Sequence, residues 1–219
     1  VGFWSDRVRH RLSDPETLFA LQKEQLGTGH ALLCAEESLA SFSGTILLLC
    51  GDVPLIREET LERLLDFHRK QSASVTVLTT ELSNPQGYGR IIREGDEVLR
   101  IVDEKDEDEG KDRREINTGI YAFEAPFVFD ALRGVGRDNA QGEYYLTDVV
   151  SAARDAGRTV CALRTDDSDE VMGVNDRQQL ASAGAIMRHR INEAHMRNGV
   201  TIVDPAATYI DPRVRIGSD

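Results

Sequence analysis

The stretch Thr45–Ile56, TILLLCGDVPLI, decides the fold class of this chain. Ile46–Cys50 is an unbroken apolar run, and Gly51–Pro54 then interrupts it before a helix-like segment begins. Such a run is typical of a strand buried on both faces, in a parallel sheet that helices cover. Ligands of these sheets bind beyond the carboxyl ends of the strands. Asp52 is expected at that end.

Composition indicates a cytoplasmic α/β protein. The chain has 219 residues, 40% of them hydrophobic, which suffices for one large domain or one domain plus part of another. The sequence shows no apolar run of membrane-spanning length and no signal-peptide pattern. The three cysteines, Cys34, Cys50 and Cys161, lack metal-type spacing and suit reduced thiols. A net charge of −12 argues against nucleic-acid binding, so an anionic substrate needs a metal ion or a few local basic groups.

Strand-like and helix-like patterns alternate along the chain, which predicts an α/β domain with a mixed sheet. Predicted strands cover residues 17–21, 46–50, 74–80, 89–93, 98–102, 116–123 and 159–163. Predicted helices cover residues 6–12, 31–39, 57–70, 125–133, 144–156 and 176–198. The charged run at residues 103–114 is expected to form an exposed loop.

The last predicted helix carries one apolar stripe at three-four spacing. Its members are Leu180, Ala183, Met187, Ile191 and Ala194. After Asn198-Gly199 the pattern changes, and isoleucines are separated by short polar turns. Ile210 and Ile216 are six residues apart, which is the spacing of a hexapeptide β-helix.

Asp52 and Asn175 each have two interpretations. Asp52 is either a cap for the following helix or a ligand of Mg²⁺, which typically takes one or two carboxylates and completes its octahedron with water and phosphate. Asn175, or its neighbour Asp176, is well placed to cap the last helix. An amide oxygen next to a metal-bound carboxylate is also suitable for Mg²⁺. Local sequence leaves both alternatives open.

Other short motifs are ambiguous when taken singly. Gly27-Thr28-Gly29 before a helix is either a structural turn or a donor of backbone N–H groups to a ligand. The turns at residues 87–89 and 141–145 have the same two interpretations. Asp103, which closes an apolar strand, is a plausible inward-facing carboxylate. No histidine spacing favours a zinc site or a catalytic triad.

Taken together and in order, these motifs resemble those of the bacterial bifunctional N-acetylglucosamine-1-phosphate uridylyltransferase/glucosamine-1-phosphate N-acetyltransferase family. The matching segments span essentially the whole chain. They are QLGTGHA (25–31), GDVPLI (51–56), NPQGYGRI (84–91), EINTGIY (115–121), NAQGEYYLTD (139–148), GVNDR (173–177) and GVTIVDP (199–205).

The resemblance implies a fold and three regions. Residues 1–175 are expected to form a Rossmann-like nucleotide-diphospho-sugar transferase domain with a mixed sheet, which lacks its first strand and phosphate loop. Residues 176–198 are expected to form a long linker helix, and residues 199–219 the first coil of a left-handed parallel β-helix that begins the acetyltransferase domain. The family's LAAGxGTRM loop and its lysine are expected upstream of Val1.

The resemblance also implies roles for individual residues. Those matching the uracil-binding positions are Gln22, Gly27 and Thr28. Those matching the segment along the nucleotide are Cys50, Gly51 and Asp52. Those matching the sugar side are Gly89, Asp103, Asn117 and Thr147. Asp52 and Asn175 match the Mg²⁺ ligands, and no other catalytic residue is assigned. Asp103 and Cys50 depart from the family, which commonly has Glu at the first position and often an aromatic or polar residue at the second.

The activity implied by the resemblance is transfer of UMP from UTP to N-acetylglucosamine 1-phosphate, which forms UDP-N-acetylglucosamine and pyrophosphate. Mg²⁺ is the expected cofactor, and no nucleic acid or membrane is an expected partner. The full-length protein is expected to be a cytoplasmic homotrimer that also acetylates glucosamine 1-phosphate from acetyl-CoA, supplying peptidoglycan and lipopolysaccharide precursors. Residues 1–219 alone are expected to be inactive or very weak. The alternatives are a sugar-1-phosphate nucleotidylyltransferase of other specificity and a non-catalytic nucleotide-sugar-binding remnant.

Overall fold

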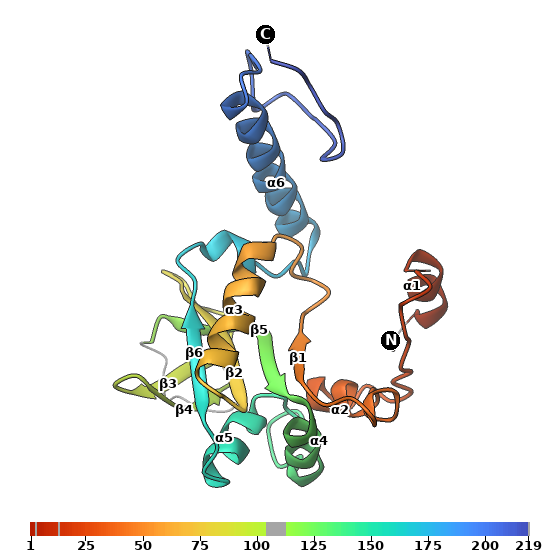
Figure 1. Cartoon of the computed structure of the whole chain (residues 1–219), viewed down its shortest axis with the longest axis vertical. Helices are drawn as coiled ribbons and strands as arrows, with labels where there is room; N and C mark the ends of the chain where they lie inside the picture. The colour runs from red at the N-terminus through yellow and green to blue at the C-terminus, as the bar shows by residue number, and fades with distance from the viewer. Residues whose placement is uncertain (3, 13, 104–112, 219) are drawn as a thin grey trace. The chain divides into compact units, whose positions relative to one another are not determined.

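The structure, a computed structural model, describes residues 1–2, 4–12, 14–103 and 113–218. Residues 104–112, most of the charged run expected to form an exposed loop, lie outside the described residues. The chain divides into two compact units (Figure 1). The sheet unit comprises Val1–Leu49 and Glu59–Asp166, and the helix unit comprises Cys50–Glu58 and Asp167–Asp219.

The sheet unit is built on a six-stranded sheet with the path β4-β3-β5-β2-β6 and with β1 paired to β5. The strands are β1 (Thr45–Leu48), β2 (Val75–Glu81), β3 (Arg90–Glu94), β4 (Glu97–Val102), β5 (Glu115–Glu124) and β6 (Val160–Arg164). The β2–β6 ladder is parallel, whereas the other ladders are antiparallel. The predicted mixed sheet is therefore confirmed.

Strand β5 organises the sheet. One edge pairs with β2 from Glu115 to Phe123. The other edge pairs with β1 over Tyr121–Glu124 and with β3 at Ile116. Strands that are separate in sequence are thus joined through one long strand, whose residues Ile120–Phe123 are almost fully buried.

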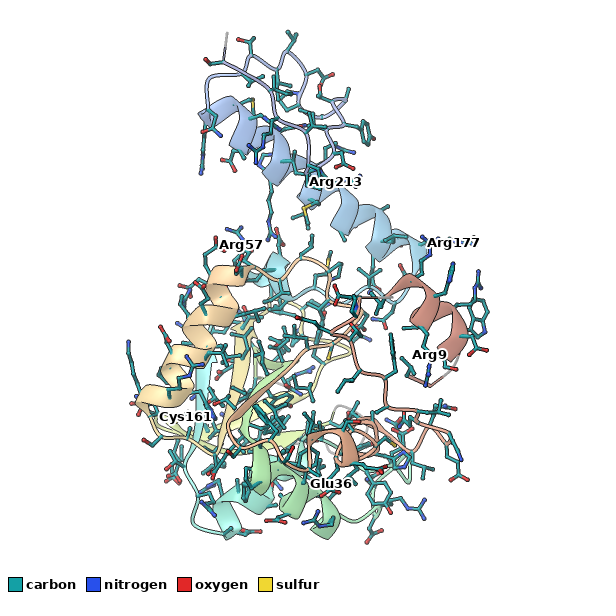
Figure 2. All side chains as sticks on the ribbon, turned by 45° about the vertical axis from the view of Figure 1, so that its right-hand side comes forward. Arg9, Glu36, Arg57, Cys161, Arg177 and Arg213 are labelled. Carbon is teal, nitrogen blue, oxygen red and sulfur yellow. The ribbon has the colours of Figure 1, made fainter. Side chains whose placement is uncertain are left out.

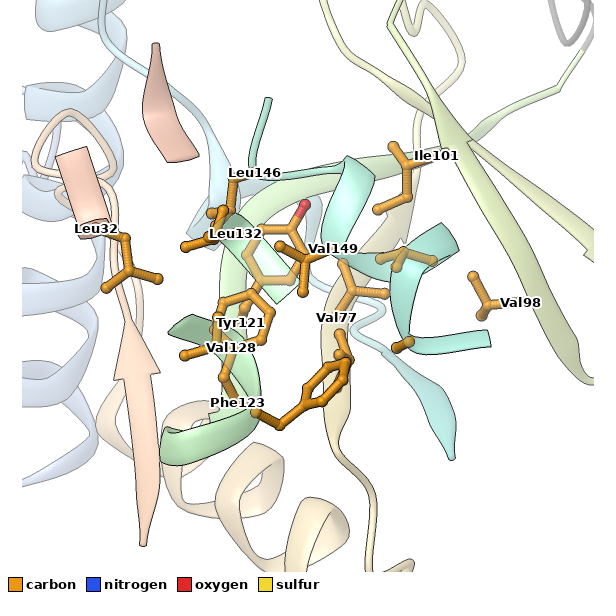
Figure 3. Close-up of a cluster of buried hydrophobic side chains, with 14 of the residues drawn as sticks. Leu32, Val77, Val98, Ile101, Tyr121, Phe123, Val128, Leu132, Leu146 and Val149 are labelled. Atoms are coloured by element: carbon orange, nitrogen blue, oxygen red, sulfur yellow. The ribbon is translucent and has the colours of Figure 1, made fainter. Parts of the chain in front are cut away.

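Helices cover both faces of β2. The helices of the sheet unit are α1 (Ser5–Arg11), α2 (Thr28–Leu33), the short 3₁₀ helix η1 (Glu37–Leu39), α3 (Glu58–Lys70, nearly all of it in this unit), α4 (Ala125–Gly134) and α5 (Asp148–Asp155). Val75 and Val77 join a hydrophobic cluster with residues of α4 and α5 (Figure 3). Thr76 points to the opposite face, because successive strand residues alternate, and its Oγ1 lies 2.8 Å from Nδ1 of His68 in α3. Burial of His68 lowers the pKa of its imidazole.

Two predictions made from apolar runs were wrong. β1 is a strand, but it is only partly buried and pairs antiparallel with β5, and the next residue, Leu49, is 47% exposed. Residues 17–21 do not form a strand, and Leu18 is 73% exposed. An apolar run indicates a preference for burial but carries no information about the direction or the presence of a pairing partner. The predicted helix at 144–156 begins only at Asp148.

The helix unit contains α6 (Arg177–Arg197) and the short 3₁₀ helix η2 (Ser168–Val171). The predicted apolar stripe on α6 was wrong in part, since Leu180 is 59% exposed whereas Ala183 and Asn192 are buried. The side-chain N–H groups of Asn192 donate to the backbone oxygens of Pro205 at 2.7 Å and Thr208 at 2.9 Å. These bonds hold the segment that follows α6 against the helix, so the helix also buries a polar residue that was not part of the predicted apolar stripe.

Residues 199–218 form turns, and no strand is present in this described stretch. A coil of a β-helix forms strands by hydrogen-bonding to neighbouring coils, and the described part of the chain contains no such neighbour. Among the described residues, no helix combines the length and the apolar character needed to cross a membrane. Cys34, Cys50 and Cys161, all among the described residues, form no disulfide.

Candidate functional site

The predicted metal ligands lie close together within the helix unit. The backbone N–H of Val174 donates to the backbone oxygen of Asp52 at 2.8 Å, which joins the two segments that carry the ligands. A Cβ added to Gly173 would lie 3.6 Å from Nδ2 of Asn175 and 3.8 Å from Oδ2 of Asp52. Both side chains therefore reach the same point beside Gly173. We call residues 50–58 and 167–176 together the metal-pair region.

Neither residue of this pair caps a helix. The N-cap of α6 is Asp176, whose carboxylate accepts from the N–H of Gln179 at 2.7 Å while the Gln179 side chain accepts from the N–H of Asp176 at 3.2 Å. This reciprocal arrangement is a capping box. Asp52 lies in a turn well before Glu58, where α3 begins. The capping alternative left open by the sequence is therefore excluded for both side chains.

The donor set fits Mg²⁺. It offers one carboxylate and one amide oxygen, which are hard ligands, and both residues are exposed, which leaves room for water and phosphate oxygens. Among the described residues, no group of three or more His, Cys, Asp or Glu side chains is arranged so that it could hold a metal ion, so a closed protein cage is not formed there. Gly51 leaves open space beside the backbone, since a Cβ there would meet nothing within 4 Å.

Cys50 is not suited to be a nucleophile. Burial raises the pKa of its thiol, and the negative charge of Asp52 raises it further. The thiolate, which is the reactive form, is therefore disfavoured at neutral pH. The position of Cys50 along the nucleotide, which the resemblance implies, stays a prediction.

The three residues expected at the base-binding position form one cluster in the sheet unit. Nε2 of Gln22 donates to the backbone oxygen of Gly27 at 3.1 Å and lies 3.1 Å from Nδ1 of His30. Oγ1 of Thr28 accepts from the backbone N–H of Leu146 at 3.2 Å. The structure brings Gln22, Gly27 and Thr28 together. Some of their polar groups are already hydrogen-bonded to other groups of the protein.

Tyr144 was missed by the sequence interpretation, although it explains the glycines of this turn. Gly29 donates its N–H to the backbone oxygen of Tyr144 at 2.9 Å, and Tyr144 donates its own to Leu26 at 2.8 Å. Gly27 has φ of 102°, and a Cβ there would lie only 2.7 Å from the Tyr144 oxygen. The His30 and Tyr144 rings are also stacked. In the sequence, the adjacent aromatic residues of the EYY motif were the signal that could have pointed to this contact.

Asp103 and Thr147 line one cavity of about 570 Å³ in the sheet unit, which we call the acidic cavity. Its other lining residues come from β4, the loop before α5 and α5 itself: Arg100, Ile101, Val102, Asp138, Asn139, Ala140, Tyr145, Asp148 and Ser151. Three carboxylates and one guanidinium give the lining a net negative charge. Carboxylates accept hydrogen bonds from hydroxyls and repel phosphates, so this cavity suits an uncharged polyol better than a phosphate group.

Gly89 and Asn117 are neighbours beside this cavity. The N–H of Asn117 donates to the backbone oxygen of Gly89 at 2.9 Å. A Cβ on Gly89 would lie 3.3 Å from Ile101 and from the backbone oxygen of Val102, two residues that line the cavity. Oδ1 of Asn117 accepts from the N–H of Gly119 at 3.0 Å, which fixes the amide orientation.

Asn139 also was missed. Its Nδ2 donates to the backbone oxygen of Glu143 at 2.6 Å, and its Oδ1 accepts from the N–H of Glu143 at 3.1 Å. These bonds fold residues 139–143 into a compact loop at the cavity rim. An Asn that precedes a glycine-containing loop is a recognisable turn signal.

The fold and these clusters define a nucleotidyltransferase. A sequence model described as Nucleotidyl transferase matches residues 6–171, and the chain belongs to that family. The whole chain is 66% identical over 220 residues to the bifunctional protein GlmU of Syntrophotalea carbinolica and covers 47% of that protein. It is 56% identical over 222 residues to GlmU of Geobacter metallireducens, again with 100% of this chain and 47% of the relative covered. The chain thus spans about half the length of the curated relatives it matches.

A solved structure shares the fold. It is described as a putative glucose-1-phosphate thymidylyltransferase from Bacillus anthracis in complex with a sucrose. It aligns with a TM-score of 0.60 and 18% identity, covering 77% of this chain and 64% of the other.

Proposed function

We propose that the protein transfers UMP from UTP to N-acetylglucosamine 1-phosphate, with Mg²⁺ held by Asp52 and Asn175. The observation that carries this proposal is the convergence of these two side chains beside Gly173 while Asp176 provides the helix cap. The similarity of the whole chain to bifunctional GlmU proteins supports the choice of substrates.

The reaction is an in-line displacement. A phosphate oxygen of N-acetylglucosamine 1-phosphate attacks the α-phosphorus of UTP, one new P–O bond forms, and the bond to the pyrophosphate leaving group breaks. Mg²⁺, when bound, neutralises phosphate charge. The protein contributes positioning and charge compensation rather than a covalent intermediate.

Each group of predicted site residues binds a different part of the two substrates. Gln22, Gly27 and Thr28 orient the uracil base, and Cys50 and Gly51 lie along the nucleotide. Gly89 and Asn117 contact the sugar, and Asp103 and Thr147 accept its hydroxyls in the acidic cavity. Because that cavity is itself anionic, the phosphates of both substrates are best held elsewhere, next to the metal ion.

The proposal extends to the whole protein. Residues 199–219 form the first coil of a left-handed parallel β-helix once further coils pair with it. That domain acetylates glucosamine 1-phosphate from acetyl-CoA, and the protein is a cytoplasmic homotrimer. Residues 176–198 act as the linker helix between the two catalytic regions.

Pyrophosphate release by the full-length protein tests the proposed reaction. With UTP, Mg²⁺ and N-acetylglucosamine 1-phosphate we expect rapid release, and with EDTA or without the sugar phosphate we expect none. Glucose 1-phosphate with UTP or dTTP is the matched comparison. If turnover with one of these pairs is faster than with UTP and N-acetylglucosamine 1-phosphate, the proposed substrate specificity is wrong. No release with any sugar phosphate would leave only a non-catalytic nucleotide-sugar-binding role.

A further inference from the structure

One carboxylate in the helix unit collects two arginines from distant parts of the sequence. Oδ2 of Asp167 accepts from Nη2 of Arg57 at 2.6 Å and lies 3.3 Å from Nη2 of Arg190. Arg57 comes directly before α3 (Figure 2), whereas Arg190 lies on α6. Oδ1 of Asp167 also accepts from the N–H of Asp169 at 3.1 Å. The Asp167 carboxylate therefore joins the segment at 50–58, η2 and α6.

Arg190 makes the more buried of the two ion pairs. Its side chain is 20% exposed, whereas that of Arg57 is 48% exposed, so solvent screens the Arg190 pair less. Nη1 of Arg190 also donates to the backbone oxygen of Leu55 at 2.7 Å. One guanidinium thus holds a backbone group of the loop that carries Asp52 and, at the same time, a side chain of the segment that leads to Asn175.

The contacts of Arg190 and the backbone bond between Val174 and Asp52 connect the two segments that carry Asp52 and Asn175. Leu55 is 2% exposed and Val53 is 8% exposed, which anchors the loop on either side of Pro54. On the ligand side, the bond from Val174 N–H to the Asp52 oxygen ties the same two segments together. The two segments are therefore joined at three points: by Arg190, by the Arg57–Asp167 ion pair and by that backbone bond.

We propose that Arg190, together with Asp167, is a positioning residue that sets the spacing between the Asp52 and Asn175 side chains. The inference rests on the proposed role of that pair in holding Mg²⁺. Mg²⁺ requires near-ideal octahedral geometry with short bonds, so small displacements of an exposed ligand weaken binding. Residues that orient metal ligands without touching the metal typically change metal affinity about 10- to 100-fold when substituted.

The test uses Arg190→Met in the full-length protein, because Met fills a similar volume and donates no hydrogen bond. We expect the Mg²⁺ concentration for half-maximal pyrophosphate release to rise about 10-fold or more, with little change in the KM for the sugar phosphate. Titration of Mn²⁺ as a probe, followed by electron paramagnetic resonance, should show the same weakening without turnover. Arg190→Lys, which retains a charge and one donor group, should recover part of the affinity.

Arg197→Met is the matched control on the same helix. Arg197 is 76% exposed, and its ion pair within the described part of the chain is a local one with Glu193, so its removal should leave the Mg²⁺ requirement at the wild-type value. A metal-independent measurement complements the titrations. Hydrogen exchange of the Val174 N–H should be faster in Arg190→Met than in the wild type or in Arg197→Met.

The outcomes separate this inference from the proposed function. If the wild type turns over and Arg190→Met matches it in Mg²⁺ requirement, Mn²⁺ binding and Val174 exchange, the positioning role is overturned. If the wild type shows no Mg²⁺-dependent turnover while Val174 exchange still accelerates in the variant, the proposed function fails and the structural tie stands. If Arg190→Met does not fold, Asp167→Asn, which keeps the size and shape of the side chain but removes its charge, is measured in the same three experiments with the same expected results.

Discussion

The metal-pair region and the acidic cavity are built in opposite ways. In the first, the side chains of Asp52 and Asn175, the proposed ligands, are exposed, but backbone and arginine contacts fix the segments that carry them. In the second, carboxylates from several segments surround about 570 Å³ of space, and one loop at its rim is held by Asn139. The difference suits the proposed roles of the two regions, because a metal ion needs fixed ligand positions, whereas a sugar can be selected by the shape and charge of a cavity.

Asp52→Ala is the strongest test of the metal-pair region. Removing a carboxylate that binds Mg²⁺ should lower kcat/KM about a thousandfold, or about 4 kcal/mol of transition-state stabilisation, with little change in Tm. Steady-state pyrophosphate release from the full-length protein measures this effect. Asp66→Ala is the control, since Asp66 is an exposed residue of α3 that pairs with Arg69 at 3.6 Å. Equal rates for the two variants would remove Asp52 from the list of ligands.

Gly27→Ala tests the turn at Gly27-Thr28-Gly29, which is part of the proposed base-binding cluster. Backbone contacts hold this turn in place, as they do the metal-pair region. With φ of 102° and the Tyr144 oxygen 2.7 Å from the new Cβ, the substitution should cost about 1–3 kcal/mol of unfolding free energy. Urea denaturation followed by circular dichroism measures it. Gly184→Ala, inside α6 with open space around the Cβ, should instead stabilise by about 0.5–1 kcal/mol. Destabilisation of similar size in both variants would contradict this account.

Asp103→Ala tests the acidic cavity. Loss of one hydroxyl acceptor should raise the KM for N-acetylglucosamine 1-phosphate about tenfold, or about 1.4 kcal/mol, because other cavity groups still hold the sugar. The KM for UTP should not change. Asp155→Ala at the exposed end of α5 serves as the control for charge. A larger effect on UTP than on the sugar phosphate would place Asp103 outside the sugar site.

The smallest expected effect concerns an ion pair outside both sites. Burial alone would raise the pKa of Glu115, but hydrogen bonds from Arg93 at 2.6 Å and Thr79 at 2.7 Å, with nearby positive charge, lower it overall. Because the folded pKa lies below the unfolded one, about 4.3, the pair stabilises fully above that value and loses its contribution as pH falls through the folded pKa. Unfolding free energies measured at pH 7 and below pH 4 should therefore differ less in Glu115→Gln than in the wild type. An unchanged pH dependence would contradict this assignment.

Sequence reasoning was most successful where local chemistry decides the structure. The predicted helix over residues 176–198 and the strands around Val77, Ile101 and Ile120 agree with α6, β2, β4 and β5. Helix periodicity and β-branched composition are properties of short segments. The direction of β1 could not be obtained in this way, because it depends on a partner about 75 residues further along the chain.

Candidate site residues could be chosen from the sequence, whereas their arrangement in space could not. The resemblance named Asp52 and Asn175, while only the structure shows that Asp176 is the helix cap. Tyr144 and Asn139 were given no role, because the EYY motif and an Asn before a glycine-containing loop indicate a turn but do not identify its hydrogen-bond partners. The Arg190–Leu55 bond joins positions whose proximity follows from the tertiary fold alone.

The capping box at the start of α6 has an evolutionary consequence. Two adjacent positions carry separate tasks under the proposed function, since Asp176 caps the helix and Asn175 remains available as the proposed Mg²⁺ ligand. Selection can therefore act on them independently: Asp176 is free to drift among Ser, Thr, Asn and Asp, all of which cap well. Asn175 has no such freedom, because few side chains offer a neutral oxygen at that reach. In a library randomised at both codons, survivors selected for activity should vary at the second position and remain nearly uniform at the first.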